Sequence, residues 1–296
     1  MSQAPRFKIP EANLAPTAIV QSSAPDAMRP LKAHAEARGS WREALIYREL
    51  LFFLSWRDVK VRYKQTALGV LWAVIQPLFT MALFTILFGR VAKISSDGVP
   101  RPVFYFSGLL PWLFLQNTVS NASMSLVSNA NLLTKIYFPR FMLPASVMLS
   151  GVIDFLIGTL LLSGFLVYYH TGIGWGLVMW PLLVVQMAAL ALALGLFLSA
   201  INVRYRDVKY AIPFMMQVWM YLTPVIYPVT IIPIKYRPYL ALNPAAGLVE
   251  SFRHALVPSM PMHWSFLAIS AGVTLILLIA GFAFFRRTEK VFADVI

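Results

Sequence analysis

The sequence feature that most constrains this chain is a cluster of basic residues followed at once by a long uncharged stretch. The cluster comprises Arg57, Lys60, Arg62 and Lys64, opposed only by Asp58, and residues 65–89 then carry no charged side chain. As a helix those residues would measure about 37 Å, more than the hydrocarbon thickness of a bilayer of about 30 Å. Basic clusters beside an apolar span are retained on the cytoplasmic side. The stretch therefore predicts a membrane span and its direction.

The composition extends this prediction to the whole chain. Of its 296 residues, 59% are hydrophobic and 12% are charged, whereas a soluble domain has about a quarter charged residues. The net charge of +13 lies mostly at the ends of apolar stretches, which suits membrane lipids and topology and argues against nucleic acid. With no cysteine and four scattered histidines, we predict no disulfide and no metal site. The predicted fold class is an all-α polytopic membrane protein.

Six apolar segments are predicted as transmembrane helices, and together they place both termini in the cytoplasm. Of the 25 Lys and Arg residues, 19 then lie on the cytoplasmic side and 6 on the outer side, as the positive-inside rule requires. The predicted spans are residues 66–89, 103–125, 141–169, 177–200, 210–228 and 264–285.

The chain divides into four predicted parts. Residues 1–40 are rich in Ala and Pro and are expected to be a disordered cytoplasmic extension. Residues 41–64 are expected to form an amphipathic helix in the membrane interface followed by a basic linker, although a packed cytoplasmic helix is an alternative. Residues 65–285 form the six-helix transmembrane domain, and residues 286–296 form a cytoplasmic tail.

The segment between the fifth and sixth spans is too short and too often interrupted by proline to cross the membrane. Asn243 and Pro244 are typical of a helix start, with Asn as the N-cap, and the helix should stop near Val257. Glu250 and Arg253 are three residues apart and are expected to pair on one face. A short helix after a broken span predicts re-entrant structure, which is tolerated where it lines a cavity or is shielded by protein.

Polar residues inside the predicted spans are few and point to two interpretations. Asn117, Asn121, Ser125 and Ser128 share one helix face, either as interhelical hydrogen-bonding groups or as the wall of a polar conduit. Asp154 is the one acidic residue well inside a span, either a hydrogen-bonded packing residue or a substrate contact.

Aromatic residues near these spans are candidates for sugar binding, because an aromatic ring packs on the C–H face of a pyranose. Membrane-interface belts and core packing are the alternative explanation. The aromatic candidates are Trp112, Phe114, Trp219, Tyr221 and Tyr227.

Several chemistries have no motif in this sequence. The phosphate-binding pattern G-x-x-x-x-G-K-[ST] does not occur, nor do the H-E-x-x-H and G-x-S-x-G patterns. A single intramembrane carboxylate disfavours an ion-coupled carrier. We therefore predict no catalytic residue, and the chain is not expected to be an enzyme by itself.

Five segments together resemble the membrane subunit of type-2 ABC exporters of bacterial polysaccharides, which export O-antigen, teichoic acid and capsule. The resemblance runs in order from about residue 45 to the end of the chain. The segments are RDVKVRYKQTALGVLWAVIQPL (57–78), NLLTKIYFPR (131–140), NVRYRDVKY (202–210), ALNPAAGLVESFRHAL (241–256) and FRRTEKVFADVI (285–296).

The resemblance implies a homodimer of permeases in the bacterial inner membrane, with two separate ABC ATPase subunits that bind the ATP and magnesium. It implies a lipid-linked polysaccharide as substrate and a channel between the protomers, lined by the aromatic candidates with Asn117 and Asn121. It also implies that residues 41–56 touch the ATPase and that residues 229–258 contain a pair of outer gate helices, with Asn243, Pro244, Glu250 and Arg253. The implied ATPase-coupling residues are Leu132, Leu133, Lys135, Ile136 and Tyr137 in the loop after the second span, with Arg204, Arg206 and Asp207 beside it.

Two alternatives remain open from the sequence. One is an ABC permease of the same fold for a lipid or a drug. The other is a membrane-embedded enzyme that processes sugars without an ATPase partner. The sequence does not decide which glycan is carried.

Overall fold

The computed structural model describes residues 47–64, 69, 71–135, 138–171, 175–205, 207–256 and 262–289. Within these ranges the secondary structure is helical and contains no strand. The predictions for residues 1–40 and for residues 290–296 of the tail lie outside this part of the chain. All described residues belong to one unit, residues 41–296.

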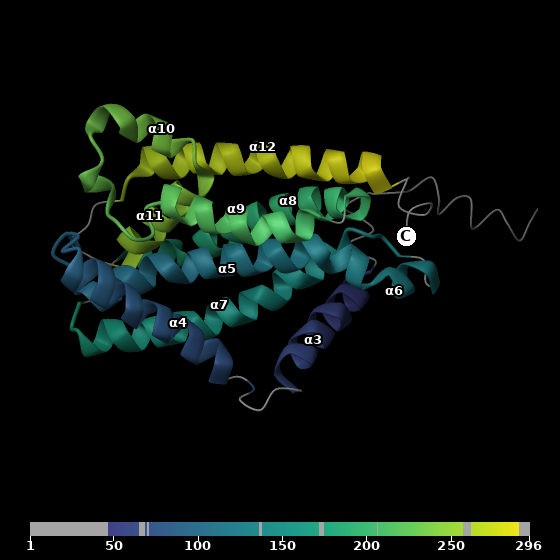
Figure 1. Ribbon diagram of the computed structural model, residues 1–296, viewed down its shortest axis with the longest axis horizontal. Coiled ribbons are helices and arrows are strands. Elements are labelled where there is room, and N and C mark those ends of the chain that lie inside the picture. Colours follow the sequence, from purple (N-terminus) through teal and green to yellow (C-terminus); the bar gives the residue numbers. More distant parts are fainter. Residues whose placement is uncertain are drawn as a thin grey trace, which may run out of the picture. The chain divides into compact units, whose positions relative to one another are not determined.

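The helical bundle is built around α5 (Arg101–Ser128), which packs against α7 (Met142–Tyr168), α8 (Trp180–Arg204) and α4 (Leu71–Phe84). On the far side of α8 lies α12 (Trp264–Glu289), and Figure 1 shows α5, α7, α8 and α12 running side by side. Most of α5 is buried, including a continuous stretch from Val103 to Trp112. It is joined to α8 by a hydrogen bond in which the Asn202 side chain donates to the Ser123 carbonyl at 3.0 Å.

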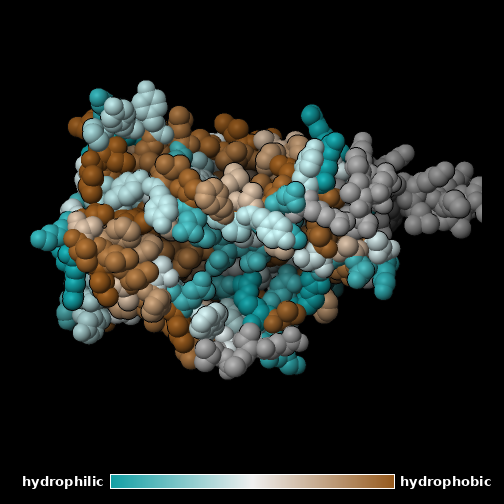
Figure 2. All heavy atoms as spheres, viewed as in Figure 1, coloured by the Kyte–Doolittle hydropathy of each residue, from teal (hydrophilic) through white to brown (hydrophobic). Residues whose placement is uncertain are grey.

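In the part of the chain that the structure describes, four helical segments are long and apolar enough to cross a membrane. They agree with the predicted first, third, fourth and sixth spans, and large apolar side chains such as Phe79, Leu160 and Ile276 are exposed on them. Figure 2 shows hydrophobic residues over much of the visible face of the bundle. Such exposure is expected of helices that meet lipid. The four segments are Leu71–Val91, Met142–Tyr168, Gly176–Arg204 and Trp264–Glu289.

The predicted second and fifth spans are helical but are not among these four. The second, α5, has 28 residues, and its amide and hydroxyl side chains lower its hydropathy. The fifth, α9 (Val208–Leu222), has 15 residues and measures about 22 Å. It ends because Thr223, which precedes Pro224, takes an extended conformation, as residues before proline do.

The start of the first span differs from the prediction. The basic residues 57–64 lie within one helix, α3 (Arg48–Lys64), so the expected basic linker is wrong. Gly69 has a φ of +49°, which a right-handed helix does not allow, and α4 therefore begins at Leu71 instead of residue 66. Pro77 lies within α4, and the last turns form the π-helix η1 (Thr85–Val91).

The segment between the fifth and sixth spans consists of short helices. Two 3₁₀ turns, η3 (Val229–Ile231) and η4 (Ile234–Tyr236), lead into α10 (Arg237–Ala241) and α11 (Pro244–Leu256). Every residue of α11 is buried, and the helix packs against α5, α8 and α12. Gly247 permits the close approach to α12, because a Cβ there would lie 2.6 Å from the Ser270 Cβ. The predicted Asn243-Pro244 helix start is confirmed.

The opposite end of the bundle holds a second apolar cluster beneath α6 (Ala130–Lys135). This cluster joins Leu54 of α3, Leu126 of α5 and Phe285 of α12. Arg140, just before α7, donates to the Glu289 carbonyl at 2.8 Å. The 3₁₀ helix η2 (Trp175–Met179) leads into α8 at the other end.

Candidate functional site

A cavity of about 200 Å³ lies between the end of α3 and helices α4, α5 and α7. In Figure 2 hydrophilic residues line a hollow in the region where α3 and α4 approach each other, with hydrophobic residues around it. Apolar and aromatic side chains form most of its wall, and polar groups from all four helices lie among them. The polar and aromatic lining residues are Arg62, Tyr63, Trp72, Gln76, Phe114, Asn117, Thr118, Asn121, Asp154 and Phe155.

An ion pair at the edge of this cavity ties α3 to α7. The Arg62 guanidinium donates to Asp154 Oδ2, and the Tyr63 hydroxyl donates to Asp154 Oδ1. One turn earlier on α3, Asp58 Oδ2 accepts from the Ser146 hydroxyl at 3.1 Å. Burial, together with the neighbouring carboxylate, raises the pKa of Tyr63 to about 12, so its hydroxyl stays a neutral donor. Asp154 thus has partners in packing and also lines the cavity, so both interpretations of this residue stay open.

The polar groups of α5 that face the cavity have unused hydrogen-bonding capacity. The Thr118 side chain is 2% exposed, and its hydroxyl has no partner in the described part of the chain. Asn117 and Asn121 also line the cavity, and within the described ranges their amides make no hydrogen bond. Gly151 of α7 allows α5 to approach, because a Cβ there would lie 2.6 Å from Thr118 Oγ1.

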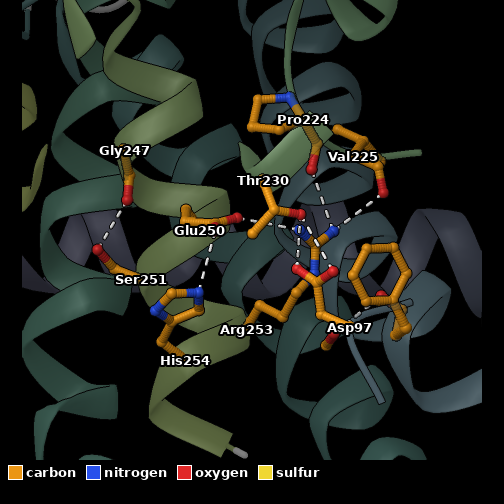
Figure 3. Close-up of polar contacts among 11 residues, drawn as sticks. Asp97, Pro224, Val225, Thr230, Gly247, Glu250, Ser251, Arg253 and His254 are labelled. Atoms are coloured by element: carbon orange, nitrogen blue, oxygen red, sulfur yellow. Dashed lines mark hydrogen bonds and ion pairs between the residues drawn. The ribbon is translucent and has the colours of Figure 1, made fainter. Parts of the chain in front are cut away.

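A second polar cluster is centred on Arg253 of α11 (Figure 3). Arg253 is 1% exposed and pairs with Glu250 at 3.0 Å. Its Nη2 also donates to the carbonyls of Pro224 and Val225, at 3.0 and 3.1 Å, just beyond the end of α9. The guanidinium lies 4.0 Å above the Phe104 ring of α5. Arg253 therefore joins α11, α5 and the chain that follows α9.

The acidic member of this cluster, Glu250, has two partners on its own helix. Glu250 also accepts from His254 Nε2 at 3.0 Å. Burial by itself would raise the pKa of Glu250, but the hydrogen bond from His254 and the Arg253 charge outweigh burial and lower it. In Figure 3 Asp97 lies on the other side of Arg253 and accepts from the Thr230 hydroxyl at 3.0 Å. The predicted pairing of Glu250 with Arg253 is confirmed.

The side chain of Asn243 connects the end of α9 to the start of α11 by hydrogen bonds. Its Oδ1 accepts from the Ala245 amide at 3.1 Å, which makes it the predicted N-cap of α11. The same oxygen accepts from Trp219 Nε1 at 3.0 Å, and its Nδ2 donates to the Thr223 hydroxyl at 3.0 Å. A shallow depression lies beside this junction. Its lining residues are Trp219, Leu222, Ile232, Tyr236, Tyr239, Leu240, Asn243 and Pro244.

The structure divides the predicted channel residues into separate groups. Phe114, Asn117 and Asn121 line the cavity, whereas Trp219 lines the depression beside α11. Trp112 is fully buried, donates to Gln116 Oε1 at 3.0 Å and meets the Trp219 ring edge-on at 5.6 Å. It is therefore a packing residue in this structure.

The other two aromatic candidates lie outside both hollows. Tyr221 is 53% exposed on α9. The Tyr227 hydroxyl donates to the Tyr221 carbonyl at 3.3 Å. The seven candidates therefore do not form one continuous wall within the described chain.

The residues expected to contact an ATPase lie at the α6 end of the bundle. Leu132 and Leu133 are half-buried against the chain's own apolar cluster, so this part of the predicted docking face is partly covered. Lys135 is exposed. Exposed Arg204 lies 5.5 Å above the Tyr205 ring, and exposed Asp207 precedes α9. Ile136, Tyr137 and Arg206 lie outside the described residues.

Three residues with contacts at these sites, Arg62, Tyr63 and His254, were not predicted from the sequence as site residues. His254 carries a signal that was available, since it follows Glu250 by four residues on the same helix. The partnership of Arg62 and Tyr63 with Asp154 spans about 90 residues, and no local pattern predicts it. No group of three or more His, Asp or Glu side chains suited to a metal ion occurs in the part of the chain that the structure describes.

Comparison with known proteins identifies clear relatives. The ABC-2 type transporter family model matches residues 49–257. The O-antigen export system permease protein RfbA of Myxococcus xanthus is 32% identical over 261 residues, covering 86% of this chain and 97% of that protein. The protein of the same name from Klebsiella pneumoniae is 26% identical over 84% of this chain and 95% of its own length. The polysialic acid transport protein KpsM of Escherichia coli is 24% identical over 86% of this chain and 98% of its own length.

Proposed function

Because this chain belongs to the ABC-2 type transporter family, we propose that it is the permease subunit of an ATP-driven exporter of a lipid-linked polysaccharide. The observation that carries the proposal is its 32% identity to an O-antigen export permease, which extends over nearly the full length of that protein. A shared site alone would not produce such coverage. The proposed location is the bacterial inner membrane.

The energy for transport comes from another chain in this proposal. The sequence has no phosphate-binding loop, so ATP and magnesium belong to an ABC ATPase partner. Two copies of the permease form the channel between them, and each copy binds one ATPase. Neither nucleotide nor metal is held by the permease.

The proposed topology has six spans with both termini in the cytoplasm. Four spans are the long apolar helices, and α5 is the second, because its length of 28 residues exceeds what a bilayer requires. The fifth crossing consists of α9 and the extended residues that follow it. Residues 229–256 return to the outer side as re-entrant structure, an arrangement supported by the complete burial of α11.

Force passes from the ATPase to the permease through residues 131–139, with Arg204, Arg206 and Asp207 beside them. The outer gate includes α10 and α11, and the buried contacts of Arg253 hold α11 to α5 and to the end of α9. When the protomers shift, α11 moves with these partners and the glycan passes between the subunits. Weak, repeated contacts with aromatic and amide side chains let the glycan slide without being trapped.

The first experiment is affinity purification of the tagged chain in detergent from its native host, followed by identification of co-purifying proteins. We expect a P-loop ATPase in equal amount, and surface glycan that is lost when the gene is deleted. Purification alone or with a synthase, with surface glycan unchanged, would contradict the proposal and favour the enzyme alternative. An ATPase partner with unchanged glycan would favour export of a lipid or drug.

A pair of variants tests the coupling residues. Ile136→Asp and Tyr137→Asp should leave the spans folded but separate ATP hydrolysis from export, because a charged residue disrupts an apolar docking face. Lys93→Asp, at an exposed position between η1 and α5, is the control for the introduced charge and should export normally. Normal export by the two aspartate variants would refute the coupling assignment.

A further inference from the structure

We propose that the cavity between α3, α4, α5 and α7 binds one uncharged sugar unit and discriminates against sugar units that bear a carboxylate or a phosphate. This inference rests on the proposed export of a glycan. It adds a binding site within one protomer and a charge preference for the sugar that occupies it.

The size of the cavity suits a single ring. Its volume is about 200 Å³. Drug-sized ligands occupy pockets of about 300–1,000 Å³. The hollow therefore has room for one pyranose with its hydroxyl groups, and a longer glycan would extend out of its open side.

The walls have the two kinds of surface that a pyranose requires. Trp72, which is 56% exposed, offers aromatic surface to the C–H face of a sugar, and the buried side chains of Phe114 and Phe155 complete the apolar part of the wall. The amides of Gln76, Asn117 and Asn121 each offer a donor and an acceptor for hydroxyl groups, and within the described ranges none of the three makes a side-chain hydrogen bond. These three residues are exposed, so sugar hydroxyl groups would replace water as their hydrogen-bonding partners.

Thr118 is the independent indication that a polar ligand belongs here. Its side chain is 2% exposed, and its hydroxyl is without a hydrogen bond to any described residue. Buried hydroxyls nearly always have a partner, because an unpaired one keeps the cost of its lost hydration. A ligand hydroxyl in the cavity would supply the missing partner.

The charges at the cavity explain the preference for a neutral ligand. Arg62 is the one cation among the lining residues that the structure describes, and its guanidinium is already paired with Asp154. Tyr63 is a neutral donor to the same carboxylate. Of the other basic residues of α3, Arg57 pairs with Asp58 at 2.8 Å and does not line the cavity. An incoming carboxylate or phosphate would be desolvated beside Asp154, and the described lining residues offer no free cation to pair with it.

The test measures sugar binding to the full-length chain in lipid nanodiscs by saturation-transfer difference NMR. The probes are N-acetylglucosamine and mannose as neutral sugars, and N-acetylneuraminic acid as the anionic sugar. We expect saturation transfer to at least one neutral probe and at least tenfold weaker binding of the acid. Equal binding of the acid, or no binding of either neutral probe, would overturn the proposal.

Variants locate the binding site. Ala73→Phe places a ring in the cavity and should abolish binding, whereas Ala82→Phe, on the exposed side of the same helix, should leave it unchanged. Thr118→Val keeps the shape and should weaken neutral-sugar binding about two- to tenfold, the usual worth of one hydrogen bond. Binding that is equal in wild type, Ala73→Phe and Thr118→Val would place the sugar elsewhere and refute the assignment.

A gain of function tests the charge argument. Asp154→Asn leaves Arg62 without its anion, so the variant should bind N-acetylneuraminic acid at least tenfold more tightly than the wild type does. No gain in a variant that still binds the neutral probe would refute the charge preference.

Export and ATPase association are measured on the same strains. Intact export without sugar binding would overturn this inference alone. Sugar binding without export or ATPase would instead overturn the proposed function.

Discussion

Replacement of Arg253 by methionine should destabilise the protein more than most single substitutions, because this side chain joins three parts of the outer end of the bundle. Arg253→Met removes the ion pair to Glu250 and the donors to the carbonyls of Pro224 and Val225. Methionine fills the space of the aliphatic part of the side chain but leaves the position of the guanidinium end empty. Gly108 of α5 leaves room at this position, since a Cβ there would lie 2.5 Å from Arg253 Nη2.

The expected loss is about 3–5 kcal/mol, the usual cost of removing one partner of a buried ion pair. Two carbonyl hydrogen bonds to a charged donor, each of about 1.5–3 kcal/mol, are lost in addition. These costs are not additive, because Glu250 keeps its bond from His254. Lysine keeps the charge but has no fork to reach both the carboxylate and the carbonyls, so Arg253→Lys should fall between wild type and Arg253→Met.

The assay is reversible unfolding in mixed micelles by a denaturing detergent, followed by tryptophan fluorescence. Trp180 reports on α11 because its ring lies 4.9 Å from that of Phe252. Arg90→Met, at an exposed position, is the matched control and should change the unfolding free energy by less than about 0.5 kcal/mol. A loss below about 1 kcal/mol for Arg253→Met would refute the reasoning. So would strict additivity with Glu250→Gln in a double-mutant cycle.

Three further outcomes follow from the structure. Asn243→Ala removes the N-cap of α11 and should cost about 1–2 kcal/mol, whereas Asn243→Asp keeps the capping oxygen and should cost less; equal losses would contradict the capping role. Arg62→Glu and Asp154→Arg should each lower the free energy of unfolding, and the double variant should recover part of that loss because the ion pair is restored with its charges exchanged. A double variant whose loss equals the sum of the two single losses would argue against the ion pair. Burial, with a neighbouring histidine, lowers the pKa of His263 below 6.5, so the folded state binds fewer protons there and stability should decline as the pH falls below about 6.5. His263→Asn should flatten that decline, and an unchanged pH profile would assign it to another group.

Much of the helical framework was predictable because it depends on local patterns. The spans that became α7, α8 and α12 are long, apolar and bounded by charged or aromatic residues, and their predicted limits lie within a few residues of the observed ones. The start of α11 at Asn243 and Pro244 was also predictable, because an N-cap and a proline in the first turn depend only on contacts within the same helix.

Other features depended on contacts that a local pattern does not contain. The basic residues 57–64 continue the helix α3, which its packing on α7 through Arg62 and Asp154 stabilises. The sequence around Trp112 does not distinguish a buried tryptophan from one that lines a channel. Trp112 is buried because α5 packs at the centre of the bundle. The cavity itself is formed by side chains from four helices, so its existence follows from their arrangement and not from any one segment.

The amino-acid sequence by itself determined that this chain has helices suited to a membrane and the family to which it belongs, and it predicted the direction of its spans. These properties follow from hydropathy, from the placement of basic residues and from short motifs, all of which act within one segment. Only the tertiary structure decided which polar groups meet. The Arg253 cluster and the Arg62–Asp154 pair join residues far apart in the chain, because burial gives each charge a strong preference for a partner wherever the fold provides one.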